Sequence, residues 1–387
     1  MTPERRPKGT GSIREREGKY QATYSFNDAT GKRRRRSKLF RTKTAARSWL
    51  NERIAETQTG RHADAGHLTV GQYISDWVAS LDGTGLEPTT LSWYRSAAIR
   101  HIIPKLGSVK LTNLSPVMIE AFLLDQKARG RLDGNGGLGP SSVRRLQVTL
   151  HKALDAALRK GMLARNPVDL AETPRMPEID ATAHIWTSDE LAQFVSSTSE
   201  NRLAGIWRTA AMTGLRRSEI CGLTWPDVDL DRGVLSIRQA AVVVNGRRHV
   251  KLPKTSSSRR TVELDDGTTQ ALRAWRKDQL QERLRAGEAW HEGQWVVTDE
   301  LGAPINPEWF SDLFLRHAEE AGLPRMTLRQ LRHSHATALL QAGVHPKVVQ
   351  ERLGHSSIRV TMDVYSAVLP NMQREAVELL AQTFDSG

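Results

Sequence analysis

The carboxyl-terminal half of the chain places several cationic side chains ahead of a single tyrosine. They occur in the stretches TGLRRSE, PKTSSSRR, TLRQLRHSHAT and LGHSSIRVTMDVYS. The candidate residues are Arg216, Lys254, Arg329, Arg332, His355 and Tyr365. Arginine and lysine bind phosphate groups, and a tyrosine hydroxyl can act as a nucleophile. Any one of these residues is commonplace at a protein surface, but their order and shared context make the set specific.

The residue types in this set suit the attack of an alcohol on a phosphodiester. Negative charge builds up on the phosphoryl oxygens, and the sequence shows no cysteine-rich or carboxylate-rich metal site to neutralise it. The guanidinium groups of Arg216 and Arg332 can do so, because each offers a planar fork of donors that stays charged. Tyrosine has a pKa of about 10 in solution, so Tyr365 benefits from a neighbouring cation or base. His355 and Arg329 are the candidates for that role.

The leaving oxygen needs a proton, which a lysine on a hairpin can deliver once neighbouring cations lower its pKa. Lys254 is the candidate donor. Because the tyrosine would hold the phosphoryl group as an ester, bond energy is retained and we expect neither a nucleotide cofactor nor a metal ion. Gly-rich phosphate loops, HExxH helices and GxSxG elbows are absent from the sequence, and Cys221 is its only cysteine.

The net charge of +13 is concentrated near the amino terminus. Residues 1–65 carry 17 Lys and Arg against 7 Asp and Glu, a net of +10, which leaves +3 for the other residues. Such concentration favours a module for a polyanion, with nucleic acid ahead of an acidic membrane surface, although a disordered basic tail is the alternative. No apolar run approaches the eighteen or so residues that span a bilayer, and the start lacks a secretory signal. We therefore expect a cytoplasmic protein associated with the nucleoid.

The basic segment shows a strand pattern that backs the nucleic-acid interpretation. Tyr20, Ala22, Tyr24 and Phe26 alternate onto one face, a turn follows, and the chain resumes as a basic strand. A helix capped by Thr44 comes next and carries one apolar stripe. A small sheet backed by one helix can present the basic strand to a DNA groove. The expected DNA-binding residues are Arg33, Arg34, Arg35, Arg36 and Lys38.

The fold class predicted for the whole chain is multidomain and mainly α. Residues 1–62 form the small β-sheet and helix just described. Residues 68–172 show four helical stripes, the third of which starts at Ser115-Pro116 with serine as the cap. A Pro-rich linker leads to residues 182–387, which are mostly helical with a β-hairpin insert turning at Asn245-Gly246.

The chain resembles the tyrosine recombinases, in particular the phage-type integrases. The resemblance covers all three segments, which it identifies as an arm-type DNA-binding domain, a SAM-like helical core-binding domain and a catalytic domain. The stretch LGHSSIRVTMDVYS is close to the family's box that ends at the nucleophile. The catalytic residues that the resemblance implies are the arginines Arg216 and Arg332, the hairpin lysine Lys254, the late histidine His355 and the nucleophile Tyr365.

One position departs from the family pattern. Where the family usually has His-x-x-Arg, this chain has Arg329-Gln-Leu-Arg332. A shift of register to His333 would place Ala336 where the second arginine belongs, so Arg329 takes the place of the usual histidine. We expect Arg329 to bind phosphate.

The resemblance implies a site-specific recombinase of a phage or another mobile element, which cleaves and rejoins double-stranded DNA through a 3′-phosphotyrosine. Its implied partners are core and arm attachment sites, three further protomers in a homotetramer, a directionality factor and a DNA-bending protein, with no membrane. Residues after Tyr365 show helical spacing and could dock on a neighbouring protomer or on their own domain. A topoisomerase of type IB shares the chemistry but has little use for an arm domain. A non-catalytic DNA-binding regulator would explain the charge but not the ordered catalytic set.

Overall fold

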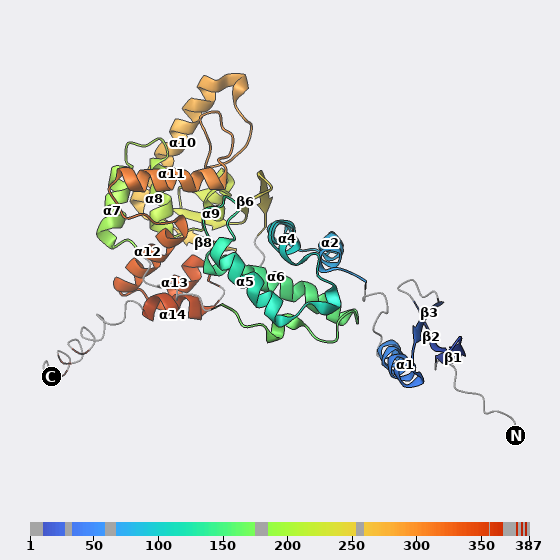
Figure 1. The fold of residues 1–387 in the computed structure, drawn as a ribbon. Helices are drawn as coiled ribbons and strands as arrows, with labels where there is room; N and C mark the ends of the chain where they lie inside the picture. Colours follow the sequence, from blue (N-terminus) through green and yellow to red (C-terminus); the bar gives the residue numbers. More distant parts are fainter. Residues whose placement is uncertain are drawn as a thin grey trace. The chain divides into compact units, whose positions relative to one another are not determined.

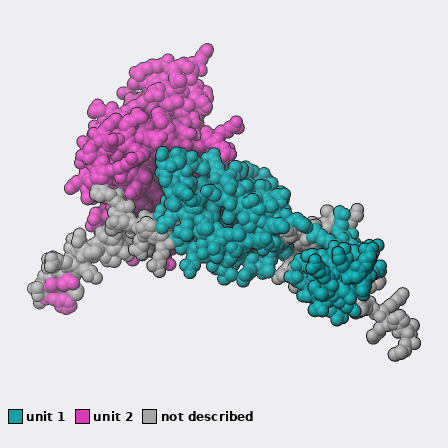
Figure 2. All heavy atoms as spheres, in the orientation of Figure 1, with its two compact units in different colours: residues 1–177 teal, residues 178–387 magenta. Residues whose placement is uncertain are grey.

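The computed structural model describes residues 11–27, 33–58, 67–174, 185–252, 259–355 and 357–366, together with positions 377, 381 and 384. The chain divides into two compact units, residues 1–177 and residues 178–387 (Figure 2). Small sheets accompany a mainly helical fold, as the sequence predicted (Figure 1). None of the described helices is long and apolar enough to cross a lipid bilayer.

The first unit begins with an antiparallel sheet of three strands in the order β1-β2-β3. The strands are β1 (Ser12–Arg16), β2 (Lys19–Asn27) and β3 (Arg33–Phe40), and α1 (Lys43–Gln58) packs against β2. Ala22 and Tyr24 of β2 are buried against Ala46 and Leu50 of α1. The predicted cap at Thr44 is wrong, since Thr42 Oγ1 accepts from the Ala45 amide at 3.2 Å. Two threonines lie two residues apart here, and α1 begins at Lys43, directly after the first of them.

The rest of the first unit is helical, with the four predicted stripes confirmed. Its helices are α2 (Val70–Ser80), α3 (Pro88–Ala97), the π-helical turn η2 (Ala98–Ile102), α4 (Ile103–Leu106), the short η3 (Leu111–Asn113), α5 (Pro116–Arg129), α6 (Pro140–Arg159) and η4 (Pro167–Leu170). The predicted cap of α5 is present, since Ser115 Oγ accepts from the amide of Met118. Apolar stripes of α2, α5 and α6 meet in one core that is separate from the core of the sheet module. Removing apolar surface from water contributes about 25 cal/mol of stability for each Å² buried, which is the main stabilising contribution in such a core.

The second unit holds eight α-helices among the described residues. They are α7 (Ser188–Ser197), α8 (Ala204–Thr213), α9 (Arg217–Ile220), α10 (Asp266–Ala286), α11 (Pro307–Glu320), α12 (Leu328–Gln341), α13 (Pro346–Leu353) and α14 (Ile358–Ser366), with short turns η5 (Trp225–Asp227) and η7 (Gly287–Ala289). One sheet pairs β4 (Val228–Asp229), β5 (Val234–Ile237) and β8 (Arg260–Glu263). A separate hairpin pairs β6 (Ala240–Val244) with β7 (Arg247–Lys251).

The hairpin turn is the one that the sequence predicts. Asn245 and Gly246 both have positive φ, 52° and 75°, and Val244 pairs directly with Arg247. A two-residue loop with positive φ at both positions matches the twist of the flanking strands, and Asn-Gly adopts it at low cost. The insert is therefore placed by local turn chemistry.

Helix α8 lies at the centre of the second unit and packs against α10 and α12. It is buried on most sides, with Ile206, Trp207 and Ala210 in the core. The Trp207 ring stacks on Phe310 of α11, with ring centroids 4.6 Å apart and planes 12° from parallel. Rigid packing of α8 matters for the site because the loop after α8 carries the first candidate arginine.

Candidate active site

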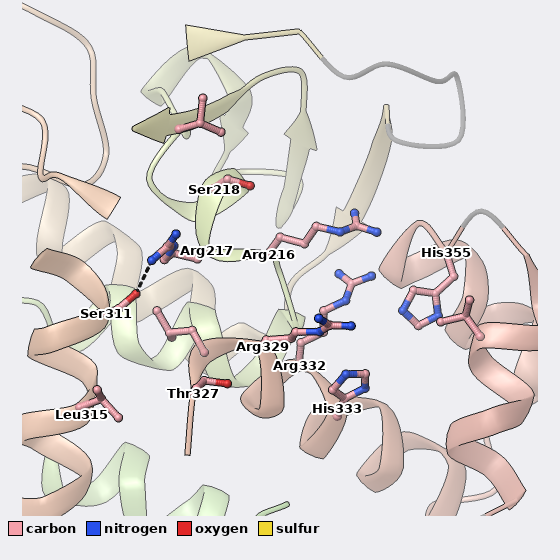
Figure 3. A pocket seen from close by; sticks show the side chains of 13 residues that line it. Arg216, Arg217, Ser218, Ser311, Leu315, Thr327, Arg329, Arg332, His333 and His355 are labelled. Atoms are coloured by element: carbon pink, nitrogen blue, oxygen red, sulfur yellow. Dashed lines mark hydrogen bonds between the residues drawn. The ribbon is translucent and has the colours of Figure 1, made fainter. Parts of the chain in front are cut away.

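A cleft of about 690 Å³ in the second unit gathers several of the candidate residues. Its lining comes from the loop before α9, from β6, from helices α9, α11, α12 and α14, and from the turn between α13 and α14 (Figure 3). The polar and charged lining residues are Arg216, Arg217, Ser218, Ser311, Thr327, Arg329, Arg332, His333 and His355. Figure 3 shows the side chains of Arg216, Arg332 and His355 extending toward one another from separate elements. The structure thus brings together four of the six predicted residues.

Arg216 is positioned by a sharp chain reversal after α8. Helix α8 ends at Gly214 in the left-handed region, with φ of 61°, and Arg216 then caps α9. A Cβ atom at Gly214 would lie 2.7 Å from the His335 ring and 2.8 Å from Leu353, so a larger residue would displace the site. The stretch TGLR therefore needs glycine at position 214 to make the turn that places Arg216. The Arg216 side chain is 40% exposed and faces the cleft.

Arg332 is the buried member of the pair, with 6% of its surface exposed. Its Nη1 donates to the Gly214 carbonyl at 2.9 Å, and its Nη2 donates to the Leu353 carbonyl at 2.6 Å. Burial, with the charge of Arg216 second, lowers the pKa of Arg332 to about 9, which leaves it protonated at neutral pH. A buried guanidinium beside a second cation favours binding of an anion. A bound phosphate would offset both the desolvation of the Arg332 charge and its repulsion with Arg216.

His355 follows a second left-handed glycine, Gly354, which ends α13 with φ of 65°. The ring is 7% exposed, and its Nδ1 lies 2.9 Å from Oγ1 of the buried Thr361 on α14. Burial and then the charges of Arg332 and Arg216 lower the pKa of His355 to about 4. The ring is therefore neutral at neutral pH. Since Nδ1 is engaged by Thr361, Nε2 is the atom that remains for substrate chemistry.

Arg329 and His333 lie one helical turn apart on α12 and both line the cleft. Arg329 is exposed, whereas His333 is half-buried. Burial, followed by the charges of Arg329 and Arg332, lowers the pKa of His333, so this ring is also neutral near pH 7. In the sequence, His333 is only an alternative register for the usual histidine, and that register is excluded by Ala336. Its place in the cleft could have been found from the i, i+4 relation to Arg329.

The side chains of two predicted residues, Lys254 and Tyr365, lie outside the part of the chain that the structure describes. Lys254 lies in the 253–258 segment, outside the described residues. Tyr365 belongs to the backbone of α14, while its side chain lies outside the description. Helix α14 packs against α12 and α13, which carry Arg332 and the turn before His355 (Figure 1). The helix of the tyrosine is thus anchored to the elements that form the cleft.

Glu219, the last residue of the stretch TGLRRSE, is a site residue to which the sequence assigned no role. Its side chain is 5% exposed and accepts from Nη1 of Arg216 at 2.7 Å and from the Arg216 amide at 2.9 Å. Burial raises the pKa of Glu219, but the hydrogen bond and charge of Arg260 and the charge of Arg216 outweigh it, and the net shift is downward. The ionised carboxylate of Glu219 therefore fixes the position of Arg216 through these hydrogen bonds. In the sequence, the i, i+3 spacing of Glu219 from Arg216 is the feature that could have predicted this pairing.

The described residues contain no group of three or more His, Cys, Asp or Glu side chains placed to hold a metal ion. The cations that line the cleft are the side chains of Arg216, Arg217, Arg329 and Arg332. Such an arrangement can bind one phosphate group and stabilise extra charge on it.

The predicted DNA-binding run on β3 is divided by the strand's alternation. Arg34, Arg36 and Lys38 pair with Phe26, Tyr24 and Ala22, so they share the sheet face that α1 covers. Arg33 and Arg35 are on the opposite face, as is Ser37, whose Oγ lies 3.0 Å from Thr23 Oγ1. The same register puts Arg14 and Arg16 of β1 on this second face. Arg14, Arg16, Arg33 and Arg35 therefore define a basic face opposite the one that α1 covers, which we call the open face.

Comparison with known families decides what these features belong to. Residues 186–372, which include the whole cleft, match the model of the phage integrase family. Residues 12–57 match an arm DNA-binding domain, and residues 69–124 match the phage integrase N-terminal SAM-like domain. The chain belongs to the phage integrase family. It is a tyrosine-type, site-specific DNA recombinase, and the family predicted from the sequence is confirmed.

Relatives of this integrase-family chain match it along nearly its whole length. A protein of Caldanaerobacter subterraneus subsp. tengcongensis described as "Tyrosine recombinase XerC-like" is 27% identical, covering 94% of this chain and 96% of the relative. The integrase of Mycobacterium phage L5 is 28% identical, covering 97% and 99%. The ICEBs1 integrase of Bacillus subtilis is 25% identical, covering 94% and 97%.

Solved structures with the same fold are also those of recombinases. The Tn1549 transposon integrase in complex with transposon right end DNA aligns with a TM-score of 0.65 at 20% identity, covering 81% of this chain and 100% of that one. A lambda integrase tetramer bound to a Holliday junction aligns with a TM-score of 0.55 at 19% identity, covering 93% and 96%. At this level of identity the likeness is one of fold.

Proposed function

We propose that the cleft holds the scissile phosphate of a DNA strand and that Tyr365 attacks it. The observation that carries this assignment is the pairing of Arg216 and Arg332 across one cleft, with both guanidinium groups fixed to backbone carbonyls. Fixed donors stabilise the pentacoordinate transition state because they need not reorganise as negative charge develops on the phosphoryl oxygens. Arg329, which is exposed at the same cleft, supplies a further cation.

The proposed step conserves every bond and proton. The Tyr365 oxygen forms a bond to phosphorus while the bond to the 5′ oxygen breaks, which leaves the DNA 3′ end on the tyrosine. His355 takes the phenolic proton, because its ring is neutral whereas the guanidinium of Arg329 has no free lone pair. Lys254 gives a proton to the leaving 5′ oxygen. Attack by a 5′ hydroxyl of another strand reverses the step and joins new partners.

The domain roles follow from the same assignment. We assign residues 1–62 to arm sites, residues 68–172 to the core site and residues 182–387 to catalysis. The family matches over residues 12–57, 69–124 and 186–372 each fall within one of these segments and support the assignment. Strand exchange between two duplexes needs four active sites, so we propose a homotetramer on DNA, assisted by a directionality factor and a DNA-bending protein. Such a complex would form in the cytoplasm, at the nucleoid.

Joining between two duplexes tests this function against relaxation by a topoisomerase. A labelled duplex and a plasmid would both carry the attachment site from the DNA that flanks the gene. Recombination transfers the label to the plasmid and changes its flanking sequence, whereas a relaxing enzyme only removes supercoils. Relaxation without transfer of label would replace the recombinase by the topoisomerase alternative.

We predict that the open face of the amino-terminal sheet contacts arm DNA. Replacing both Arg33 and Arg35 with Gln should weaken arm binding, and the log-log slope of affinity against salt should fall by about 0.9 for each lost phosphate contact. Salt titrations of binding to attachment DNA measure this slope. The matched control replaces Arg34 and Lys38, which lie on the helix-covered face. Equal losses for both pairs would show that the sheet face does not select the contacts.

We predict that Arg329 binds phosphate as a cation. Arg329→Ala should slow cleavage about tenfold or more, because a hydrogen bond to a charged group is worth about 1.5–3 kcal/mol, while Arg329→Lys should retain part of the rate. Arg329→His should also be tolerated, since the family places histidine there. Stability should change little because Arg329 is exposed. Arg325→Ala, an exposed arginine outside the cleft lining, is the control. Full cleavage by Arg329→Ala would remove the residue from the site.

A further inference from the structure

The C-terminal end of α13 is capped by three arginines from three different elements. Its last carbonyl oxygens accept hydrogen bonds from separate guanidinium groups. The pairs are Arg260 Nε with Arg352 O at 2.6 Å, Arg332 Nη2 with Leu353 O at 2.6 Å, and Arg216 Nη2 with Gly354 O at 3.0 Å. Carbonyls at a helix C-terminus have no partner within the helix and carry partial negative charge, so cations there are stabilising. The next residue is His355, which makes this cap part of the site's frame.

Arg260 differs from the other two arginines because it is not among the cleft-lining residues. It lies on β8, and its side chain is only 7% exposed. Its Nη1 and Nη2 donate to Oε1 and Oε2 of Glu219 at 3.1 and 2.9 Å, while Nε serves the Arg352 carbonyl. All three guanidinium nitrogens thus have protein partners. Arg260 is built into the protein rather than presented to DNA.

Glu219 connects Arg260 to the cleft. Each of its oxygens accepts from both arginines: Oε1 from the two Nη1 atoms, and Oε2 from the Arg216 amide and Arg260 Nη2. The single negative charge of Glu219 is therefore shared between two cations. Without Arg260, the whole charge of Glu219 would act on Arg216 and compete with an incoming phosphate for the same guanidinium.

We propose that Arg260 is a positioning residue for the recombination reaction, which through Glu219 and the Arg352 carbonyl fixes Arg216 against the end of α13. The inference rests on the proposed function, since it takes the scissile phosphate to be the anion that Arg216 binds. Displacement of a catalytic group by about 1 Å can cost about 100-fold in rate. Loss of Arg260 should therefore act on the chemical step far more than on DNA affinity.

The test compares two substrates that differ in charge at the scissile position. One nicked core-site duplex carries the natural phosphate, and the other carries a methylphosphonate, which is neutral because a methyl group replaces one oxygen. Single-turnover formation of the covalent adduct is measured for the wild type, Arg260→Met and Arg260→Lys, with DNA affinity measured in parallel. A neutral phosphonate depends less on Arg216, so a defect that acts through Arg216 should shrink on it.

Arg202→Met is the matched structural control. Arg202 also forms a two-pronged pair with a glutamate, Glu282, at 2.6 and 2.7 Å, and donates to the Thr298 carbonyl at 2.8 Å. Arg202 is not among the residues that line the cleft. Its loss should lower the thermal midpoint and leave the ratio of the two substrate rates unchanged.

We expect Arg260→Met to form the phosphate adduct about 10- to 100-fold more slowly than the wild type, with DNA affinity within about threefold and a much smaller defect on the phosphonate. Arg260→Lys keeps the charge but cannot donate to Glu219 and to the Arg352 carbonyl at the same time. It should therefore also form the phosphate adduct more slowly, with a smaller defect than Arg260→Met. If Arg260→Met fails to fold, the lysine variant decides. Equal defects on both substrates, or wild-type rates on phosphate, overturn the proposal. A wild type that forms no adduct on either substrate would instead overturn the proposed function.

Discussion

Tyr365→Phe should abolish covalent attachment to DNA while leaving the protein folded and able to bind its site. The substitution removes one oxygen, so at most one hydrogen bond of about 1 kcal/mol is lost and the ring can still pack. No other residue in the proposed step can replace the phenolic oxygen. Denaturing gels of protein incubated with a nicked core-site duplex, from which the short cleaved fragment diffuses away, measure the adduct.

The control for this variant is the binding of the same duplex under native conditions. Tyr365→Phe should shift the duplex at the wild-type concentration and melt within a few degrees of the wild type. An adduct formed by the phenylalanine variant would mean that the nucleophile is another residue, and the assignment of α14 would be wrong.

Arg332→Lys should slow cleavage by about 100- to 1000-fold, although it preserves the charge. Removal of one preorganised donor to a developing oxyanion has an effect of that size. A lysine is a point charge, so it cannot serve the Gly214 and Leu353 carbonyls and also face the phosphate as a fork. Single-turnover cleavage rates give the chemical effect, and thermal melting gives the structural one.

The loss of a backbone hydrogen bond should also lower the stability of Arg332→Lys by about 1–2 kcal/mol. Rates measured well below the melting temperature separate this from catalysis, and DNA affinity should change much less than the rate. Cleavage within threefold of the wild type would show that a single positive charge suffices at Arg332 and that the fork geometry is irrelevant.

Much of the fold could be predicted from local patterns. The alternation of Ala22 and Tyr24 and the Asn245-Gly246 turn each arise from a few neighbouring residues, and the structure contains the corresponding sheet and hairpin. The cap at Ser115 was predictable for the same reason. Thr42 and Thr44 were not distinguishable, because they lie two residues apart and either hydroxyl suits the start of a helix; the structure begins α1 at Lys43, which makes Thr42 the cap.

The frame behind the site could not be predicted from the sequence. Arg260 and Glu219 are 41 residues apart, and Arg332 lies 118 residues from the Gly214 carbonyl that it contacts. No local spacing encodes such contacts, since they depend on how α8, α12 and β8 pack. The order of the basic residues on β3 was visible in the sequence. Their division between two sheet faces follows from the strand pairing.

The most direct test of the central claim is to map the covalent adduct of the wild type. The protein would be trapped on a nicked core-site duplex and digested with protease, and the nucleotide-bearing peptide would be sequenced by mass spectrometry. The account predicts a peptide modified at Tyr365 and attached to the 3′ phosphate of the cleaved strand, with a free 5′ hydroxyl on the released fragment. Attachment through another residue, or to a 5′ phosphate, would contradict it.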